Sequence, residues 1–385
     1  MSTTTTTRTN DRTATLYLAF ELGAGKWRLG FTTGIAQKPR ERTVAACDVE
    51  AVLREIARAK ERFGLAAEAQ VVSCYEAGRD GFWLHRCLTA HSIENRVVDS
   101  ASIEVNRRKR RAKTDRLDVG KLLNLLLRYE AGERKAWSVV RVPTDVEEDA
   151  RQLHRELLAA KRDRTRVTNR IRGLLASQGL TIELKKKDLP KQLDRMRRWD
   201  GSGLPASLRQ RLEREWAKAQ FFTEQIGALD RERRKLLRDA NDPALKKVMQ
   251  LLHLQGVGIN GAWLQTMELY GWRNFRNGKE IGSLSGLTPT PHHSGELRHE
   301  LGIDKAGNKR VRWMAIESAW AWLRFQRQSA LSQWYERRFA HGGPRMRKVG
   351  IVALARKLLI ALWRYLETGV LPEGAEVKKH AVISY

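Results

Sequence analysis

The sequence is poor in cysteine and in acidic residues, and it has no long apolar run. Among its 385 residues, Cys47, Cys74 and Cys87 are the only cysteines and none has CxxC spacing. This excludes a zinc signature or a disulfide framework of the usual kind and suits a reducing cytoplasm. No apolar run reaches about eighteen residues, so we expect no membrane span. Residues 1–13 are polar and lack the apolar core of a signal peptide, and we expect them to form a disordered tail.

The shortage of acidic residues leaves the chain strongly basic. Lys and Arg number 72 against 44 Asp and Glu, which gives a formal net charge of +28. Such a charge predicts a polyanionic partner, because each phosphate neutralised by Lys or Arg releases condensed counterions. A ribosomal-type basic protein would share this charge, but the length and 42% hydrophobic content allow two or three domains with real cores. Composition therefore indicates nucleic acid without indicating an activity.

Residues 14–135 have the pattern of an α/β domain. Strand-like apolar segments are separated by turn residues, and Val52, Ile56 and Phe63 follow at helical spacing. The expected order is three strands, a helix, a strand, a helix, a strand and a helix, at 13–22, 26–34, 40–46, 49–63, 69–78, 81–91, 95–99 and 115–130. That order predicts a ribonuclease-H-like fold for this domain.

Residues 145–240 change to a seven-residue repeat. Apolar residues fall seven apart from Val146 to Leu174 and again from Leu208 to Leu236, with turn residues between Pro190 and Pro205. This spacing is typical of helices that pack along a seam. Two long helices on either side of a breaker predict either an antiparallel hairpin or a seam used for dimerisation. Polar residues at some heptad positions leave both arrangements open.

Residues 246–370 are expected to form a third, mostly helical domain. Two strongly apolar helices are predicted at 313–328 and 349–367. The segment 286–312 is rich in turn residues and is predicted to be a long polar loop. We expect residues 371–385 to form a dispensable tail.

Four carboxylates stand out by their positions. Glu21 ends the first strand candidate, Glu76 ends the fourth, and Asp115 and Asp118 share one face of the following helix. If the first and fourth strands are neighbours, all four converge at one edge of the sheet, where Mg²⁺ or Mn²⁺ would have to offset their charge. Two such ions could activate a hydroxyl and stabilise the leaving oxygen of a phosphodiester. Each acid alone is more often a solvated surface group, so their joint placement carries this hypothesis.

Two segments are candidates for contact with nucleic acid. A basic tract leads directly into the acidic pair, where it would hold a phosphate backbone, and consists of Arg107, Arg108, Lys109, Arg110, Arg111 and Lys113. In LQGVGINGA, Gly256 and Gly258 fit a helix-hairpin-helix turn that brings backbone N–H groups to a DNA phosphate. A tight turn between two packed helices would produce the same glycine spacing.

Ser294 is a candidate nucleophile in the predicted polar loop. It follows His293 and precedes the cations Arg298, Lys305, Lys309, Arg310 and Arg312. A neighbouring base could take the proton of its hydroxyl, and the cations could stabilise the charge that develops. Spacing alone favours a plain turn serine in a flexible basic loop.

These motifs together resemble the DEDD transposases of bacterial insertion sequences (insertion-sequence family one-ten), whose relatives include pilin-gene invertases. FELGAGKWRLGF, YEAG and KTDRLDVGKLL are similar to the three acidic motifs of that family. LQGVGINGAWLQTMEL, FRNGKEIGSLSGLTPTPHHSG, IDKAGNKRVRWMAIESAW and ALARKLLIALW follow in the order found in the family. The resemblance extends over residues 14–370.

The resemblance implies a RuvC-like nuclease domain at 14–135, a coiled coil at 145–240 and a transposase domain at 246–370. It places the metal-binding tetrad on Glu21, Glu76, Asp115 and Asp118 and the catalytic serine on Ser294. It also implies a structured non-coding RNA that guides recognition of donor and target DNA. The first tetrad position is usually Asp, so Glu21, one methylene longer, departs from the pattern of the family.

The sequence thus predicts an RNA-guided, metal-dependent DNA recombinase acting in insertion-sequence transposition. We expect a homodimer or homotetramer, since recombination handles several strand ends, and a cytoplasmic, nucleoid-associated protein. One alternative is a stand-alone RuvC-like junction endonuclease, although that activity needs no second basic domain. The other alternative is a non-enzymatic basic scaffold that binds RNA or DNA, in which the carboxylates only support structure.

Overall fold

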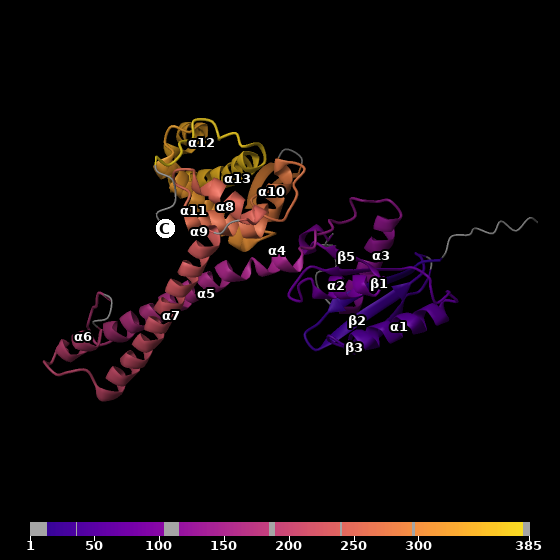
Figure 1. Cartoon of the computed structure of the whole chain (residues 1–385), viewed down its shortest axis with the longest axis horizontal. Coiled ribbons are helices and arrows are strands. Elements are labelled where there is room, and N and C mark those ends of the chain that lie inside the picture. Colours follow the sequence, from indigo (N-terminus) through magenta and orange to yellow (C-terminus); the bar gives the residue numbers. More distant parts are fainter. Residues whose placement is uncertain are drawn as a thin grey trace, which may run out of the picture. The chain divides into compact units, whose positions relative to one another are not determined.

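The computed structural model describes residues 14–35, 37–103, 115–184, 189–238, 241–294 and 297–379. The chain divides into two compact units, Met1–Pro143 and Thr144–Tyr385, and each is described by itself (Figure 1). Within the described ranges, no helix is long and apolar enough to cross a membrane.

The first unit is built on a mixed five-stranded sheet. Its strands are β1 (Leu16–Leu22), β2 (Lys26–Thr32), β3 (Arg40–Ala45), β4 (Val71–Glu76) and β5 (Glu94–Val98), in the spatial order β3-β2-β1-β4-β5. The first three strands pair antiparallel, whereas β4 runs parallel to both β1 and β5. The order of strands and helices along the chain is the one that the sequence predicts.

Helices cover both faces of this sheet. Because successive side chains of a strand point to opposite faces, β1 sends Leu18 and Phe20 into one core and Ala19 into another. The first core is closed by α1 (Val49–Arg62) and α2 (Trp83–Ala90), and the second by α3 (Asp115–Glu130). A short 3₁₀ turn, Ser100–Ser102, follows β5.

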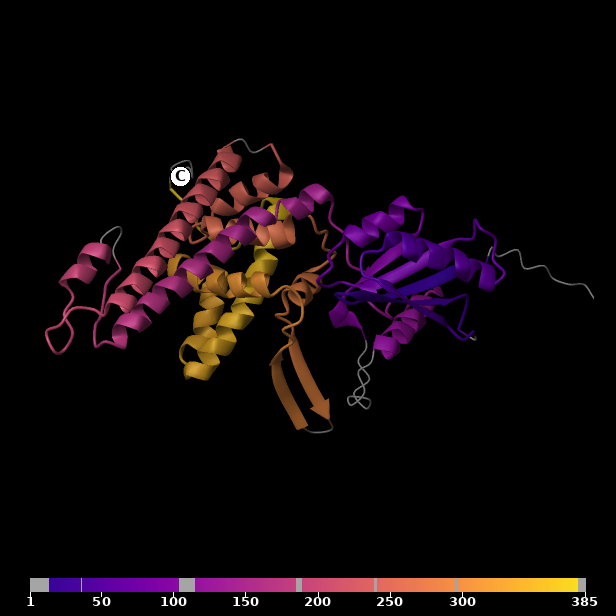
Figure 2. The same cartoon turned by 90° about the horizontal axis from the view of Figure 1, so that it is seen from below.

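The second unit begins with a short helix and a long helical hairpin. Its helices are α4 (Asp145–Asp149), α5 (Gln152–Ala176), α6 (Leu189–Arg195) and α7 (Ala206–Arg238). Both views show α5 and α7 lying side by side with α6 at the far end (Figures 1 and 2). Of the two arrangements that the heptads leave open, the structure shows the hairpin within one chain.

Buried ion pairs account for the polar heptad positions of α7. The Glu215 carboxylate accepts hydrogen bonds from Arg170 of α5 and from Lys218. Arg233 pairs with Asp230 and donates to Asn260. These two positions therefore carry charge without breaking the seam, since each buried charge has a partner.

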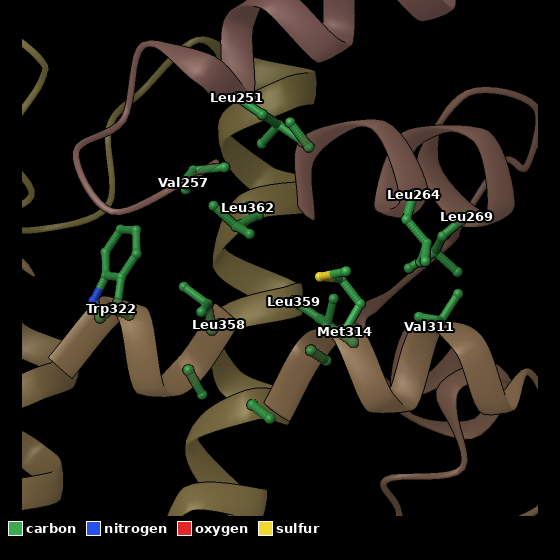
Figure 3. Close-up of a cluster of buried hydrophobic side chains, with 14 of the residues drawn as sticks. Leu251, Val257, Leu264, Leu269, Val311, Met314, Trp322, Leu358, Leu359 and Leu362 are labelled. Atoms are coloured by element: carbon green, nitrogen blue, oxygen red, sulfur yellow. The ribbon is translucent and has the colours of Figure 1, made fainter. Parts of the chain in front are cut away.

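The rest of the second unit is mostly helical. It contains α8 (Pro243–Leu252), α9 (Ile259–Gln265), α10 (Gly278–Ser285), α11 (Lys309–Phe325), α12 (Ala330–Tyr335), α13 (Pro344–Thr368) and two π-helical turns, Thr266–Tyr270 and Glu336–Ala340. Its core gathers Leu358, Leu359 and Leu362 of α13 with side chains of α8 and α11, among them Leu251 and Trp322 (Figure 3).

The predicted polar loop is wrong over half its length, because it contains a β-ribbon. Strands β6 (Pro289–Ser294) and β7 (Leu297–Ile303) pair antiparallel and extend from the helices as a ribbon (Figure 2). The two prolines that argue against a strand are tolerated because Pro289 opens β6 and the pairing register shifts between Pro289 and Pro291.

The segment after α13 is hydrogen-bonded to the rest of the second unit as far as Lys378. The backbone of Gln255 donates to the Glu376 carbonyl at 3.0 Å, and the backbone of Lys378 donates to the His253 carbonyl at 2.9 Å. The buried Gln326 amide donates to the Glu376 carbonyl and accepts from the Glu376 N–H, each at 2.8 Å. We expected a dispensable tail here, whereas residues 373–378 form a strap across the turn between α8 and α9.

Candidate functional site

Two of the four predicted carboxylates end neighbouring parallel strands. The register of β1 and β4 pairs Leu16 with Val71 and continues to Phe20 with Tyr75. Glu21 and Glu76 are the next residue on each strand. They therefore lie beside one another at the carboxyl edge of the sheet. The sequence predicts this placement if the first and fourth strands are neighbours.

The face on which these two residues lie follows from the alternation of the strands. Ala19 and Cys74 belong to the core beneath α3, and Glu21 and Glu76 are two residues further along the same strands. Residues two apart in a strand share a face. Glu21, which is half-buried, and Glu76, which is exposed, thus occupy the face that α3 covers.

The first turns of α3 cross the sheet next to this edge. A Cβ added to Gly30 of β2 would overlap Val119 Cγ1 and lie 2.9 Å from Leu123 Cδ1, so α3 approaches the strand more closely than any side chain at position 30 allows. Gly30 pairs with Ala19, two residues before Glu21. Helix α3 begins at Asp115, which places Asp115 and Asp118 in the turn that precedes this contact.

The structure describes the backbone of Asp115 and Asp118 but not their side chains. Among the side chains it does describe, no group of three or more His, Cys, Asp or Glu is placed to hold a metal ion, and that search leaves out the two aspartates. The basic tract, Arg107–Arg111 and Lys113, lies outside the described residues. The backbone thus places the ends of β1 and β4 side by side on the face of the sheet that α3 covers.

Cys74 lies within this region and is excluded as a nucleophile. Its side chain is fully buried beneath α3, with Sγ 3.9 Å from the carbonyl oxygen of Leu122. Burial raises the pKa of the Cys74 thiol far above its usual range, because the thiolate would be poorly solvated there.

Ser294 is the last residue of β6 and pairs with Leu297 of β7. It therefore lies at the tip of the ribbon, where β6 ends and β7 begins. Its side chain and that of Arg298 lie outside the described residues. The prediction of a turn serine in a flexible loop is therefore wrong, because Ser294 ends a paired strand.

The base of the ribbon is held by tight backbone contacts. A Cβ at Gly286 or at Gly307 would overlap the carbonyl oxygens of Ala306 and Leu284, respectively, and both glycines have positive φ. Asn308 donates its N–H to the Leu284 carbonyl at 2.8 Å and caps the first turn of α11. These contacts fix where β6 begins and where the chain continues after β7.

The predicted cations near the ribbon fall into two groups. Arg312 donates to the carbonyls of Ser285 and Ala306, so its guanidinium stabilises the base of the ribbon. Lys305 and Lys309 are exposed, and Arg310 is half-exposed at the start of α11. These three remain candidates for contact with phosphate.

The glycines of the predicted helix-hairpin-helix turn differ in role. Gly256 has a φ of +79° and packs against α11, where a Cβ would lie 3.0 Å from Phe325 Cβ, so packing alone requires glycine. Gly258 is exposed and is the N-cap residue of α9. The strap already takes the Gln255 N–H and the Val257 carbonyl of this turn.

Sequence reasoning missed a buried charge cluster around Glu268. This carboxylate is 2% exposed and accepts hydrogen bonds from His154 Nε2 at 3.0 Å, from Arg155 at 2.8 and 2.9 Å, and from Asn308 at 2.9 Å. Burial by itself would raise the pKa of Glu268, but the bonds from His154 and Arg155 hold it well below its usual range. Glu268 thus joins α5 to the turn that precedes α11.

Comparison with known proteins finds similar transposases. The Transposase IS116/IS110/IS902 family model matches residues 249–336. The chain is 39% identical to the putative transposase y4rJ of Sinorhizobium fredii over 94% of both chains. It is 25% identical to the transposase for insertion sequence element IS1328 of Yersinia enterocolitica, over 61% of this chain and 67% of that protein. It is 26% identical to the transposase for insertion sequence element IS1111A of Coxiella burnetii, over 62% and 64%.

Proposed function

Since this chain belongs to the IS116/IS110/IS902 family of transposases, we propose that it cuts and rejoins DNA in transposition by metal-assisted chemistry at the edge of a RuvC-like sheet. The strand order β3-β2-β1-β4-β5 with one parallel extension supports the ribonuclease-H-like assignment. The observation that carries the proposal is that Glu21 and Glu76 end neighbouring parallel strands on the sheet face that α3, which begins at Asp115, covers.

Glu21, Glu76, Asp115 and Asp118 would hold Mg²⁺ or Mn²⁺. Carboxylate oxygens are the ligands these hard cations prefer, and adjacent carboxylates need such a charge to stay ionised together. A bound ion there would polarise a phosphodiester and favour departure of the sugar oxygen. Glu21 reaches one methylene further than the usual Asp, and we expect Glu21→Asp to retain activity.

Ser294 would be the nucleophile. Its Oγ would attack phosphorus and lose its proton, a sugar oxygen would leave, and the protein would become joined to one DNA end through a phosphodiester. The position of Ser294 at the end of β6 supports this role, because the tip of an extended ribbon can reach a DNA strand. Rejoining reverses the step when the hydroxyl of a new DNA end displaces Ser294.

The remaining expectations belong to the same proposal. A structured non-coding RNA would guide recognition of donor and target DNA, and the net charge of +28 supports binding of both polyanions. A homodimer or homotetramer would handle several strand ends, and the protein would act at the bacterial nucleoid. The exposed Lys305 and Lys309 and the basic tract, Arg107–Arg111 and Lys113, would contact phosphates.

Trapping of the covalent intermediate tests the proposal. Wild-type protein with element-end DNA, guide RNA and Mg²⁺ should yield a protein–DNA adduct that survives denaturation, and Ser294→Ala should yield none. Ser283→Ala is the matched control, because Ser283 is an exposed serine of α10. An adduct that persists in Ser294→Ala contradicts the assignment of the nucleophile. Normal strand exchange without divalent metal favours a non-enzymatic role for the carboxylates.

A further inference from the structure

A large groove lies between α13 and the base of the ribbon. Its volume is about 1060 Å³, at the upper end of the roughly 300–1,000 Å³ of small-molecule pockets. Pro289 and Ile303 of the ribbon form one wall, and Val349 and Val352 of α13 form another, with Trp334 beside them. Figure 2 shows α13 next to the ribbon. No part of the predicted site lies in this groove.

The charged side chains of the groove are all cations. Arg345, Lys348, Arg356 and Lys357 line it, and its described lining contains no acid. The sequence from Arg337 to Leu366 has eight Lys and Arg residues and no Asp or Glu. None of the four lining cations has an ion pair among the described side chains. The groove therefore combines an apolar floor with a purely positive rim.

Two buried polar atoms, one on a residue that lines the groove and one on a residue next to the lining, lack a partner. Arg356 Nε and Thr288 Oγ1 are buried and make no hydrogen bond within the described part of the chain. Both adjoin Gly282, where an added Cβ would lie 2.8 Å from Arg356 Nε and 3.4 Å from Thr288 Oγ1. Buried polar groups are normally hydrogen-bonded. The guanidinium of Arg356 is thus held at the groove by packing and without an acceptor.

We propose that this groove binds an unpaired segment of DNA strand, with one or two bases on its apolar floor and their phosphates on Arg345, Lys348 and Arg356. A duplex presents phosphates but keeps its bases stacked inside, so it would leave the apolar floor uncovered. A single strand presents both, and base stacking on aromatic residues with phosphates on cations is the common way of binding it. The inference rests on the proposed function, since strand cleavage supplies unpaired DNA.

Trp334 and Lys357 mark where a base would lie. The ammonium of Lys357 stands over the Trp334 ring, 4.7 Å from its centroid, and Lys357 is exposed. A base that stacks on Trp334 would replace this ammonium, which would then move to the adjacent phosphate. Ser294 is the fifth residue after Pro289 along β6, about 17 Å of β-strand, so a DNA strand that continues from the groove along β6 would reach the candidate nucleophile.

Binding of single strands in EDTA, where no cleavage takes place, tests the inference. Fluorescence anisotropy of the full-length protein would compare a labelled dT12 with an abasic dodecamer that has the same phosphates. We expect dT12 to bind about 5-fold tighter or more, and Trp334→Ala to bring the two affinities together. Equal affinity of the wild-type protein for both oligonucleotides would overturn the proposal.

Two exposed valines supply a test variant and its matched control, and neither substitution should disturb the fold. Val349 is 48% exposed in the groove and Val370 is 70% exposed after α13. Val349→Glu adds a carboxylate among the cations and should weaken dT12 binding about 5-fold or more, whereas Val370→Glu should change it less than about twofold. Equal losses in both variants would overturn the proposal.

Two competitors identify the occupant. A ribonucleotide dodecamer with a larger base-dependent affinity than dT12 would contradict the assignment to DNA, and displacement of dT12 by polyglutamate at equal charge would indicate an acidic peptide. We expect neither. Asp118→Asn should leave all these affinities unchanged. The experiment therefore distinguishes an error in the proposed binding groove from an error in the proposed cleavage chemistry.

Discussion

At the residue scale, Gly30 decides how closely α3 approaches the sheet. The helix carries Asp115 and Asp118 in its first turn, and Val119 rests directly on Gly30. A side chain at position 30 would push that turn away from the ends of β1 and β4. The geometry of the candidate site thus depends on a residue that takes no part in its chemistry.

Gly30→Ala should destabilise the first unit by about 1–3 kcal/mol, because the methyl group overlaps Val119. Adding Val119→Ala should relieve the closest overlap and leave only the contact with Leu123, so Gly30→Ala should cost less in the Val119→Ala background than in the wild-type protein. Urea denaturation of the three variants measures both effects. If the two costs simply add, the contact does not exist in solution.

Glu268 is a second residue whose effect can be tested, here through pH. Its folded-state pKa is lowered from 4.5, so its contribution to stability is complete above that value and is lost as pH falls below it. Glu268→Gln should cost about 2–4 kcal/mol at pH 7, because it leaves Arg155 and His154 without a charged acceptor. The difference from wild type should shrink steadily below about pH 4.5.

The matched control is Glu317→Gln, which removes an exposed carboxylate of α11. It should have little effect at any pH. A loss in Glu268→Gln that stays constant between pH 7 and pH 3 would contradict the assignment of the low pKa.

At the element scale, the sequence predicts the strands and helices whose apolar residues repeat at a regular local spacing. The strands of the first unit, helix α3 and the hairpin helices follow from alternation or heptad spacing, and so does the placement of Glu21 and Glu76. The ribbon was missed because Pro289, Pro291 and paired histidines have low strand propensity, and only pairing across the hairpin makes them strands. Glu268 was missed because its partner His154 is 114 residues away.

The strap, residues 373–378 after α13, has no pattern in the sequence that predicts it. Its contribution to stability can be tested. Truncation after Leu371 should destabilise the second unit by about 1–3 kcal/mol. It removes Glu376, so the buried side-chain amide of Gln326 and the backbone N–H of Gln255 lose their hydrogen bonds to its backbone. Gln326→Leu should be costly in the full chain, where it leaves the backbone N–H and carbonyl of Glu376 without a partner, and less costly in the truncated chain, where only the bond to the Gln255 carbonyl is lost. Thermal unfolding of the four proteins measures this, and an equal cost of Gln326→Leu in both would contradict it.

At the scale of the whole molecule, the two units divide the proposed chemistry. The carboxylates belong to the first unit and Ser294 to the second, so the proposed reaction uses residues from both. The family relationship covers 94% of the chain, which supports treating both units as parts of one enzyme. The central claim is that the carboxylates at the edge of the sheet make strand exchange depend on divalent metal.

Strand exchange on element-end DNA by Asp118→Asn is the most direct test of that claim. The substitution keeps the shape of the side chain and removes its charge. We expect exchange to fall about 100-fold or more while DNA binding stays within about twofold of wild type. Glu61→Gln, an exposed carboxylate at the end of α1, should exchange normally. Exchange by Asp118→Asn at the wild-type rate, with the same response to Mg²⁺, would contradict the account.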